Sequence, residues 1–237
     1  MFENLDLRVG PGGLLVVHGP GGSGRTTVLL ALAGRMRLDG GAVQVGGDAL
    51  PRNGRRVREQ VAVARAEPAL GLDPDLRVRE LVAERRWLSR RLSTAQVAEA
   101  FSVLAIDVDH RTLVRDLPPV EALGVAVALA LATRPAVIVA DDVDRGCPAE
   151  DRTRVWQLLG RACRVGCTVL AGALDPPTGA GLDPAPVLVA LPRRSSLPEG
   201  RVPEEQDAST ERARQVRERP GPGDGPDGTS HGKEGRA

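Results

Sequence analysis

The chain has 237 residues with a formal net charge of +1, 41% hydrophobic residues and only 2% aromatic residues. A chain of this length can bury one hydrophobic core with a small subdomain, and its nearly neutral charge gives no electrostatic reason to expect nucleic acid as a partner. No apolar run reaches 18 residues without a charge or a proline, and no signal peptide opens the chain, so we expect a cytoplasmic protein.

The first motif along the chain is a glycine-rich loop between a predicted strand and a predicted helix. Residues 14–18 are apolar and favour a buried strand, and residues 26–36 carry apolar side chains at helical spacing. Glycines let successive backbone N–H groups point at an anion, and the N-terminus of the following helix adds its dipole. We therefore predict a nucleotide-binding P-loop (Walker A motif), with Thr26 as a ligand of Mg²⁺. Its residues are Gly19, Pro20, Gly21, Gly22, Ser23, Gly24, Arg25, Thr26 and Thr27.

Arg25 occupies the position that lysine takes in this motif. Arginine keeps the positive charge, but its planar guanidinium is bulkier and is not a compact point donor. Lys233 is the only lysine of the chain, which is the bias expected of a GC-rich genome. That bias explains where the arginine came from, but it does not explain why the site tolerates it.

Beyond the loop, short apolar strands alternate with helical stretches. This alternation predicts an α/β fold with a mostly parallel sheet, whose ligand lies at the carboxyl ends of the strands. Residues 71–117 show no convincing strand, so we expect a domain of residues 1–192 with a helical subdomain at about residues 71–134. The further strands are expected at residues 42–45, 61–64, 136–140, 168–171 and 187–191, and the further helices at residues 78–90, 94–104, 120–133 and 149–161.

The last part of the chain, residues 193–237, has a different composition. It is rich in Pro, Gly, Glu, Arg and Ser and poor in large apolar residues. Such a segment cannot bury enough surface to offset the entropy of ordering it, so we predict a disordered polar tail.

Smaller features favour ordinary structural roles. The cysteines Cys147, Cys163 and Cys167 are too few for a disulfide framework, and no His or Cys pair completes a zinc set, so buried thiols are expected. Trp87 lies among arginines; we expect it to pack in the core, with a partner-facing surface as the alternative.

The predicted strand at residues 136–140 ends in two aspartates. A buried strand that ends in a carboxylate is what a P-loop site needs to hold Mg²⁺, which assigns Asp141 to the metal. Asp142 would then face an attacking water, as the candidate general base. An acidic cap on the following helix is the alternative, but the upstream loop favours the metal site.

Several segments together resemble the nucleotide-binding domain of ABC transporters. Residues 114–135, which lead into Asp141 and Asp142, are similar in register to the family's signature helix, its Ala-Leu-Ala-x-x-Pro ending and its Asp-Glu strand end. Residues 5–9 look like the strand before the family's loop, and residues 39–47 look like its glycine-bounded hairpin. The resemblance covers roughly residues 5–191 and implies a P-loop NTPase core with a helical (signature) subdomain.

The family's catalytic positions are altered in this sequence. Losing one preorganised donor costs about 10²–10³ in rate, and losing a general base costs about 10²–10⁴, so hydrolysis is expected to be weak or absent. The backbone of the loop, Thr26 and Asp141 are kept, so Mg-ATP binding is still expected. The altered positions are Arg25 for the loop lysine, Ala66 for the Q-loop glutamine, Pro118-Pro119-Val120 for the signature Ser-Gly-Gly, Asp142 for the catalytic glutamate, Pro148 for the D-loop aspartate and Leu174 for the switch histidine.

The resemblance implies an ATP-binding subunit that works with a separate transmembrane subunit at the inner face of the cell membrane. It also implies a homodimer or heterodimer with another ABC cassette. The alternative is a non-enzymatic pseudo-ATPase that docks to a membrane protein or a partner cassette as a scaffold. A soluble ABC-like ATPase of DNA repair or translation is disfavoured, because neither a paired cassette nor a long coiled-coil insert is present. The transported substrate is not indicated by the sequence.

Overall fold

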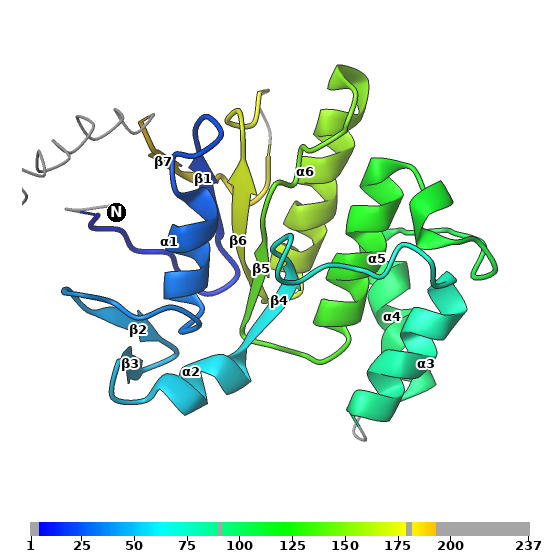
Figure 1. Ribbon diagram of the computed structural model, residues 1–237, viewed down its shortest axis with the longest axis horizontal. Coiled ribbons are helices and arrows are strands. Elements are labelled where there is room, and N and C mark those ends of the chain that lie inside the picture. The colour runs from blue at the N-terminus through cyan, green and yellow to red at the C-terminus, as the bar shows by residue number, and fades with distance from the viewer. Residues whose placement is uncertain (1–4, 90–91, 179–181, 193–237) are drawn as a thin grey trace, which may run out of the picture. The chain divides into compact units, whose positions relative to one another are not determined.

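A five-stranded sheet forms the centre of the protein in a computed structural model that describes residues 5–89, 92–178 and 182–192 (Figure 1). The strand order is β4-β5-β6-β1-β7, and every neighbouring pair is parallel. The predicted α/β fold with a mostly parallel sheet is therefore confirmed. The strands are β1 (Leu14–His18), β4 (Val61–Arg65), β5 (Val137–Ala140), β6 (Thr168–Ala173) and β7 (Val187–Ala190).

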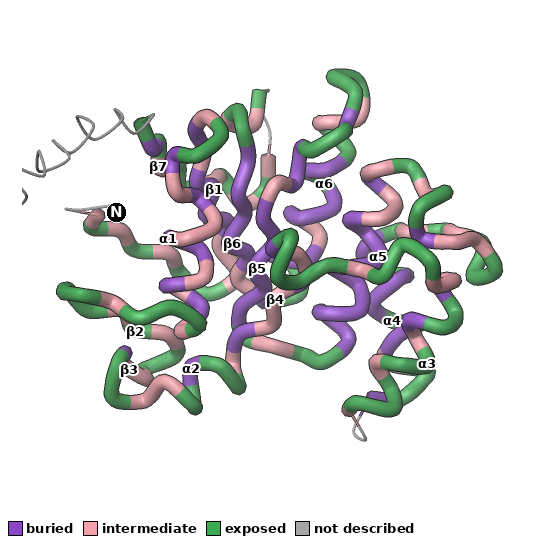
Figure 2. Tube along the Cα trace, viewed as in Figure 1, coloured by how far each residue is buried: buried purple, intermediate pink, exposed green. Residues whose placement is uncertain are grey.

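Helices cover both faces of this sheet, and the side chains of β1 show how the core divides. Leu14 and Val16 join an apolar cluster with α5 (Pro119–Leu131) and α6 (Ala149–Arg164), whereas Leu15 and Val17 join one with α1 (Arg25–Leu32). Alternation along a strand explains this division, because successive side chains point to opposite faces. Figure 2 shows the buried segments concentrated in the central strands and in α5 and α6. Continuous apolar strands are typical of parallel sheets that are covered on both faces.

A group of helices lies beside the α5 face of the sheet (Figure 1). It contains α3 (Val78–Leu88), α4 (Thr94–Leu104) and a 3₁₀ turn (Val114–Asp116). Within residues 71–89 and 92–117 the structure has no strand longer than an isolated bridge. The sequence predicted no strand in this block, and its described residues confirm that prediction. The domain limits remain a prediction.

Two short elements and one boundary differ from the sequence-based expectation. The hairpin expected at residues 39–47 lies further along the chain: β2 (Val43–Val45) pairs antiparallel with β3 (Asp48–Leu50), a strand that was not predicted. Helix α2 (Gly54–Gln60), which has Val57 as its one buried residue, was not predicted either. So few apolar positions give no periodic signal. Helix α1 ends at Leu32, short of residue 36, because Gly34 adopts the left-handed backbone that ends helices.

Two further expectations are wrong. Residues 5–9 form no strand, although their apolar side chains still pack against the α1 side of the core. Trp87 does not pack in the core: it is 80% exposed near the end of α3. It falls on the side of the helix opposite to Val78 and Leu81, the residues that α3 buries. The predicted tail, residues 193–237, lies outside the described residues.

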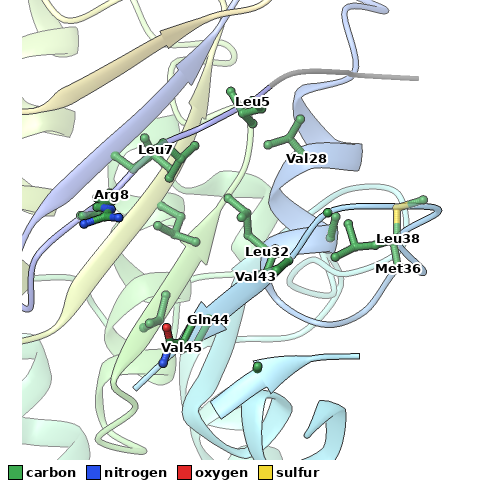
Figure 3. A pocket seen from close by; sticks show the side chains of 18 of the residues that line it. Leu5, Leu7, Arg8, Val28, Leu32, Met36, Leu38, Val43, Gln44 and Val45 are labelled. Carbon is green, nitrogen blue, oxygen red and sulfur yellow. The ribbon is translucent and has the colours of Figure 1, made fainter. Parts of the chain in front are cut away.

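An open cleft of about 1750 Å³ separates residues 5–9, helix α1 and the β2–β3 hairpin (Figure 3). Its walls are largely apolar, and Leu5, Leu7, Val28, Leu32 and Val43 point toward it. The hairpin buries Leu50, while Val43 and Val45 stay half-buried. Its packing is therefore looser than that of the central sheet.

Candidate nucleotide-binding site

The glycine-rich loop connects the carboxyl end of β1 to the N-terminus of α1. Gly24, which precedes the first residue of α1, has a φ of 97° in the left-handed region. Glycine adopts this conformation without steric cost, whereas a side chain there is strained. Gly19 passes so close to the end of β7 that an added Cβ would lie 2.3 Å from the carbonyl oxygen of Leu191. These two glycines are therefore required by the path of the loop.

The inner surface of the loop has the features of an anion cradle. Ser23 is 6% exposed, and its hydroxyl has no hydrogen-bond partner among the described residues. A Cβ added at Gly21 or Gly22 would meet nothing within 4 Å, so the space beside these residues is open. Buried polar groups are rarely left unpaired, and consecutive backbone N–H groups in such a turn suit an anion. The loop therefore fits a phosphate.

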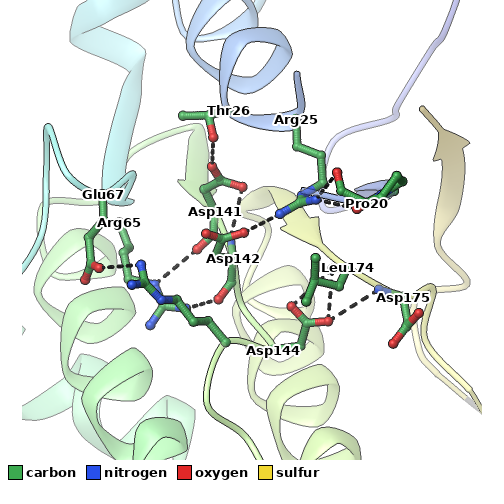
Figure 4. A network of polar contacts seen from close by, with 12 residues as sticks. Pro20, Arg25, Thr26, Arg65, Glu67, Asp141, Asp142, Asp144, Leu174 and Asp175 are labelled. Atoms are coloured by element: carbon green, nitrogen blue, oxygen red, sulfur yellow. Dashed lines mark hydrogen bonds and ion pairs between the residues drawn. The ribbon is translucent and has the colours of Figure 1, made fainter. Parts of the chain in front are cut away.

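The side chain of Arg25 is folded onto the loop itself. Its guanidinium donates through Nη1 to the carbonyl of Gly19 and, at 2.9 Å, to the carbonyl of Pro20. Its Nη2 lies 2.5 Å from Oδ1 of Asp142 (Figure 4). Arg25 is only 8% exposed, so these charge-assisted contacts are shielded from water.

Thr26 and Asp141 form the second contact between the loop and the end of β5. The hydroxyl of Thr26 donates to Oδ2 of Asp141, and the backbone N–H of Asp142 donates to Oδ1 at 2.9 Å. Asp141 is 2% exposed, and this burial raises the pKa of its carboxyl, with the hydrogen bond from Thr26 acting in the opposite direction. A hydroxyl and a carboxylate are oxygen ligands of the kind that Mg²⁺ prefers. The predicted metal pair is thus brought together.

Arg65, at the end of β4, is a component of the site that the sequence did not indicate. Its Nε donates to the carbonyl of Asp141 at 3.1 Å, and its Nη2 donates to the carbonyl of Asp142. Burial lowers the pKa of Arg65, while the charges of Glu67 and Asp142 act in the opposite direction. Asp142 has a φ of 49°, which is uncommon for a residue with a side chain. Arg65 thus fixes the backbone turn that carries the candidate base.

Asp144 is a second unexpected component. It is 5% exposed, and its carboxylate accepts hydrogen bonds from the backbone N–H groups of Leu174, at 3.0 and 3.2 Å, and of Asp175, at 3.4 Å (Figure 4). It therefore ties the segment after β5 to the segment after β6. No local pattern in the sequence distinguishes this aspartate from a solvated one.

The remaining positions of interest place no polar side chain at the loop. Ala66 is fully buried, and its backbone N–H and carbonyl both pair with Leu70. Pro119 is the first residue of α5, and Pro148 precedes the first residue of α6. Leu174 donates its backbone N–H to Asp144, and the residue is 46% exposed. These residues supply neither an amide, a hydroxyl nor an imidazole.

The family model for ABC transporters matches residues 2–144, which is more than half of the chain. The chain therefore belongs to the ABC transporter ATP-binding family. The resemblance seen in the sequence is confirmed, and the P-loop, the parallel sheet and the aspartate-ended strand agree with it.

Curated relatives are ATP-binding proteins whose names refer to export, to resistance and to import. Nod factor export ATP-binding protein I of Cupriavidus metallidurans is 32% identical over 178 residues, which cover 72% of this chain and 56% of the relative. Daunorubicin resistance ATP-binding protein DrrA3 of Streptomyces coeruleorubidus is 29% identical over 172 residues, which cover 71% of this chain and 54% of the relative. The chain thus spans about half the length of the relatives that it matches.

Solved structures share the fold at low sequence identity. The dimeric ATP-binding cassette MJ0796, in a post-hydrolysis state bound to ADP and Pi, has a TM-score of 0.58 at 20% identity, covering 73% of this chain and 79% of the other. The cbiO1 protein of Clostridium perfringens, part of the ABC transporter complex cbiONQ, has a TM-score of 0.61 at 16% identity, covering 73% and 71%. Among residues 5–89, 92–178 and 182–192, no helix is both long and apolar enough to span a membrane.

Proposed function

We propose that this protein is an ATP-binding subunit of an ABC transporter-like system that binds Mg-ATP at the modified loop, with weak or absent hydrolysis of its own. One observation carries the proposal. The loop keeps an anion cradle and the Thr26–Asp141 pair, while Arg25 holds the candidate base Asp142 at 2.5 Å. The groups that would bind nucleotide are thus kept, whereas the carboxylate of the candidate base is paired with Arg25.

The binding half of the proposal rests on the residues of the loop. The backbone N–H groups of residues 21, 22 and 24–26 and the unpaired hydroxyl of Ser23 would hold the phosphates, with Arg25 as the cationic side chain. The backbone N–H of Ser23 donates to the carbonyl of Pro20 at 3.1 Å and closes the turn of the loop. Thr26 and Asp141 would hold Mg²⁺, which when bound neutralises part of the phosphate charge. The remaining loop residues, Gly19, Pro20 and Thr27, would shape the cradle.

The catalytic half rests on what surrounds Asp142. A general base must be free to accept a proton from water, but the carboxylate of Asp142 pairs with a buried guanidinium. Ala66 and Leu174 bring no second polar group to position that water. Since each lost group costs about 10²–10⁴ in rate, even non-additive losses leave turnover far below that of an ordinary enzyme.

The comparisons support a proposal about the partners of this chain. One solved neighbour is part of an ABC transporter complex, and another is a dimeric cassette. We infer for this chain a separate transmembrane subunit, a second cassette, either identical or homologous, and a place at the inner face of the cell membrane. The substrate would be selected by the membrane subunit.

A non-enzymatic scaffold is the second candidate function. The contact that favours it is the hydrogen bonding of Arg25 to the carbonyls of Gly19 and Pro20. In this arrangement the cationic side chain of the loop is bound to the loop itself and not to a phosphate. In a scaffold the pseudo-ATPase domain would dock to a membrane protein or a partner cassette without turnover.

Nucleotide binding and phosphate release separate these functions. The purified full chain should bind a fluorescent ATP analogue saturably, more tightly with Mg²⁺ than with EDTA, and should release phosphate at well below about 1 s⁻¹. The Arg25→Lys variant should bind ATP about as tightly as the parent protein and should release phosphate faster. No binding at millimolar nucleotide leaves only the scaffold, whereas turnover within the ordinary enzyme range of about 1–10³ s⁻¹ contradicts the impaired site.

A further inference from the structure

The carboxylate of Asp142 lies against the phosphate-binding loop as an anion that belongs to the protein itself. Both terminal nitrogens of Arg25 are engaged by protein oxygens: Nη1 by the carbonyls of Gly19 and Pro20, and Nη2 by Asp142 at 2.5 Å. The remaining nitrogen, Nε, is buried and has no partner among the described residues. Both terminal nitrogens, which a phosphate would also contact, therefore already donate to protein oxygens, and Asp142 is the only charged partner among them.

The ion pair is partly withdrawn from water. The side chain of Arg25 is 9% exposed and that of Asp142 is 33% exposed, whereas the other ion pairs of the described residues each contain at least one side chain exposed by half or more. Charges shielded in this way interact more strongly than charges at the surface. A nucleotide phosphate is also an anion and suits the same guanidinium. Two anions therefore compete for one cation.

The backbone holds the carboxylate in this position. Arg65 donates to the carbonyls of Asp141 and Asp142 from the β4 side, while Arg25 pairs with the carboxylate from the α1 side (Figure 4). Asp142 has a left-handed backbone at a φ of 49°, and this turn directs its side chain toward the loop. The contact is thus built into the fold from two sides.

We propose that Asp142 is an internal anionic ligand of the phosphate-binding loop, and that a nucleotide must displace it from Arg25 in order to bind. This inference rests on the proposed nucleotide binding. The apparent affinity of a site falls in proportion to the fraction of molecules that are competent to bind. If the paired state holds about nine molecules in ten, the pair weakens nucleotide binding about tenfold.

The first test measures the affinity for Mg-ATP after Asp142→Asn. Asparagine is nearly isosteric and tolerates the left-handed backbone, so the turn is expected to persist. Binding should become about tenfold tighter, because an uncharged amide holds Arg25 less strongly. Asp175→Asn is the matched control: Asp175 lies at the same edge of the sheet but pairs with Arg152, and its variant should change the affinity less than about twofold. An unchanged affinity in Asp142→Asn overturns the proposal and leaves nucleotide binding itself intact.

A second background separates displacement from simple repulsion between two anions. In Arg25→Met there is no pair to break, so adding Asp142→Asn should improve the affinity much less than it does in the parent protein. An equal improvement in both backgrounds contradicts the proposal, since repulsion alone would then explain the gain.

A third measurement needs no nucleotide. Urea unfolding of the parent, Arg25→Met, Asp142→Asn and the double variant forms a double-mutant cycle, and the two substitutions should be clearly non-additive. Additive effects show that the pair is not formed in solution and overturn the proposal. Non-additive effects with no nucleotide binding in any variant overturn both the displacement and the proposed function.

Discussion

The hydroxyl of Thr26 donates a hydrogen bond to the carboxylate of Asp141, although 115 residues separate the two positions. The contact joins the first turn of α1 to the residue that follows β5, and a second contact, from Arg25 to Asp142, lies directly beside it. The parallel sheet makes both contacts possible, because the carboxyl ends of β1 and β5 lie at the same edge of the sheet.

Asp141→Asn should remove most of the magnesium dependence of nucleotide binding. An amide is a poorer ligand of Mg²⁺ than a carboxylate, so affinity measured with Mg²⁺ should fall at least about tenfold, as is typical when a metal ligand or its support is lost. Affinity measured in EDTA should change little. Calorimetric titrations in both buffers check this, and an equal loss in both would mean that Asp141 acts on the fold and not on the metal.

As the pH falls, the effect of Mg²⁺ on nucleotide affinity should disappear at a higher pH than it would if the pKa of Asp141 were that of an ordinary aspartate. Burial raises the pKa of Asp141 above its usual 3.8, so the carboxylate takes up a proton earlier as the pH falls. The protonated form does not bind Mg²⁺. A titration of affinity against pH, with and without Mg²⁺, should show the two curves converging above pH 3.8.

Gly172→Ala should disturb the same carboxylate from the β6 side. A Cβ at Gly172 would lie 2.0 Å from Oδ1 of Asp141 and 3.0 Å from Leu29, so the variant must displace one of them. We expect a loss of about 1–3 kcal/mol in the free energy of unfolding, together with weaker magnesium dependence. Gly40→Ala is the control, since a Cβ there meets nothing within 4 Å and should change stability by less than about 0.5 kcal/mol. Equal effects of the two variants would contradict this geometry.

Asp144→Ala should destabilise the protein through its hydrogen bonds to the segment after β6. Removing the carboxylate leaves the backbone N–H groups of Leu174 and Asp175 without their partner, at a cost of about 1–3 kcal/mol in urea unfolding. Asp175→Ala removes an exposed ion pair with Arg152 and should cost less than about 1 kcal/mol. If Asp175→Ala proved the more damaging of the two, Asp144 would not be the anchor of this segment.

The stability of the fold should decline at alkaline pH because of two buried thiols. Burial raises the pKa of Cys163 to about 11 and that of Cys167 to about 12, from an ordinary value of 9.0. Unfolded thiols therefore ionise first, so stability is full below pH 9 and falls by up to about 1.4 kcal/mol per pH unit for each thiol until the folded pKa is reached. Burial also raises the pKa of Cys147, which adds to the decline. Few other groups titrate here, since the chain has no tyrosine and Lys233 is its only lysine.

Thermal unfolding between pH 8 and pH 11 checks this expectation. The variant with both Cys163→Ala and Cys167→Ala should be less stable at neutral pH, because it leaves small cavities, but its midpoint should fall less steeply above pH 9. Parallel curves for the two proteins would assign the alkaline loss to other groups.

The two tryptophans should respond in opposite ways to truncation. Trp156 is 3% exposed within α6, so Trp156→Ala should cost about 3–5 kcal/mol. Trp87 is 80% exposed on α3, so Trp87→Ala should change stability by less than about 0.5 kcal/mol. Urea unfolding measures both values, and a large loss at Trp87 would show that its side chain is packed in solution.

The sequence by itself determined the elements whose signal is local. Apolar runs predicted β1, β4, β5 and β6, and helical spacing predicted α3 to α6, because burial imposes a period on neighbouring residues. The loop and the aspartate-ended strand also stood out, since glycine spacing and a strand-end carboxylate are local features. Elements with a single buried residue, such as α2, carry too little of this signal to be predicted.

Only the tertiary structure decided which residues of the site contact one another. Arg25 and Asp142 are 117 residues apart, Arg65 and Asp141 are 76 apart, and Asp144 and Leu174 are 30 apart. No sequence pattern links such positions; they meet because the parallel strands β1, β4, β5 and β6 end at one edge of the sheet. Local preferences thus specify where a loop and a carboxylate occur, whereas the packing of distant segments decides which charge each of them contacts.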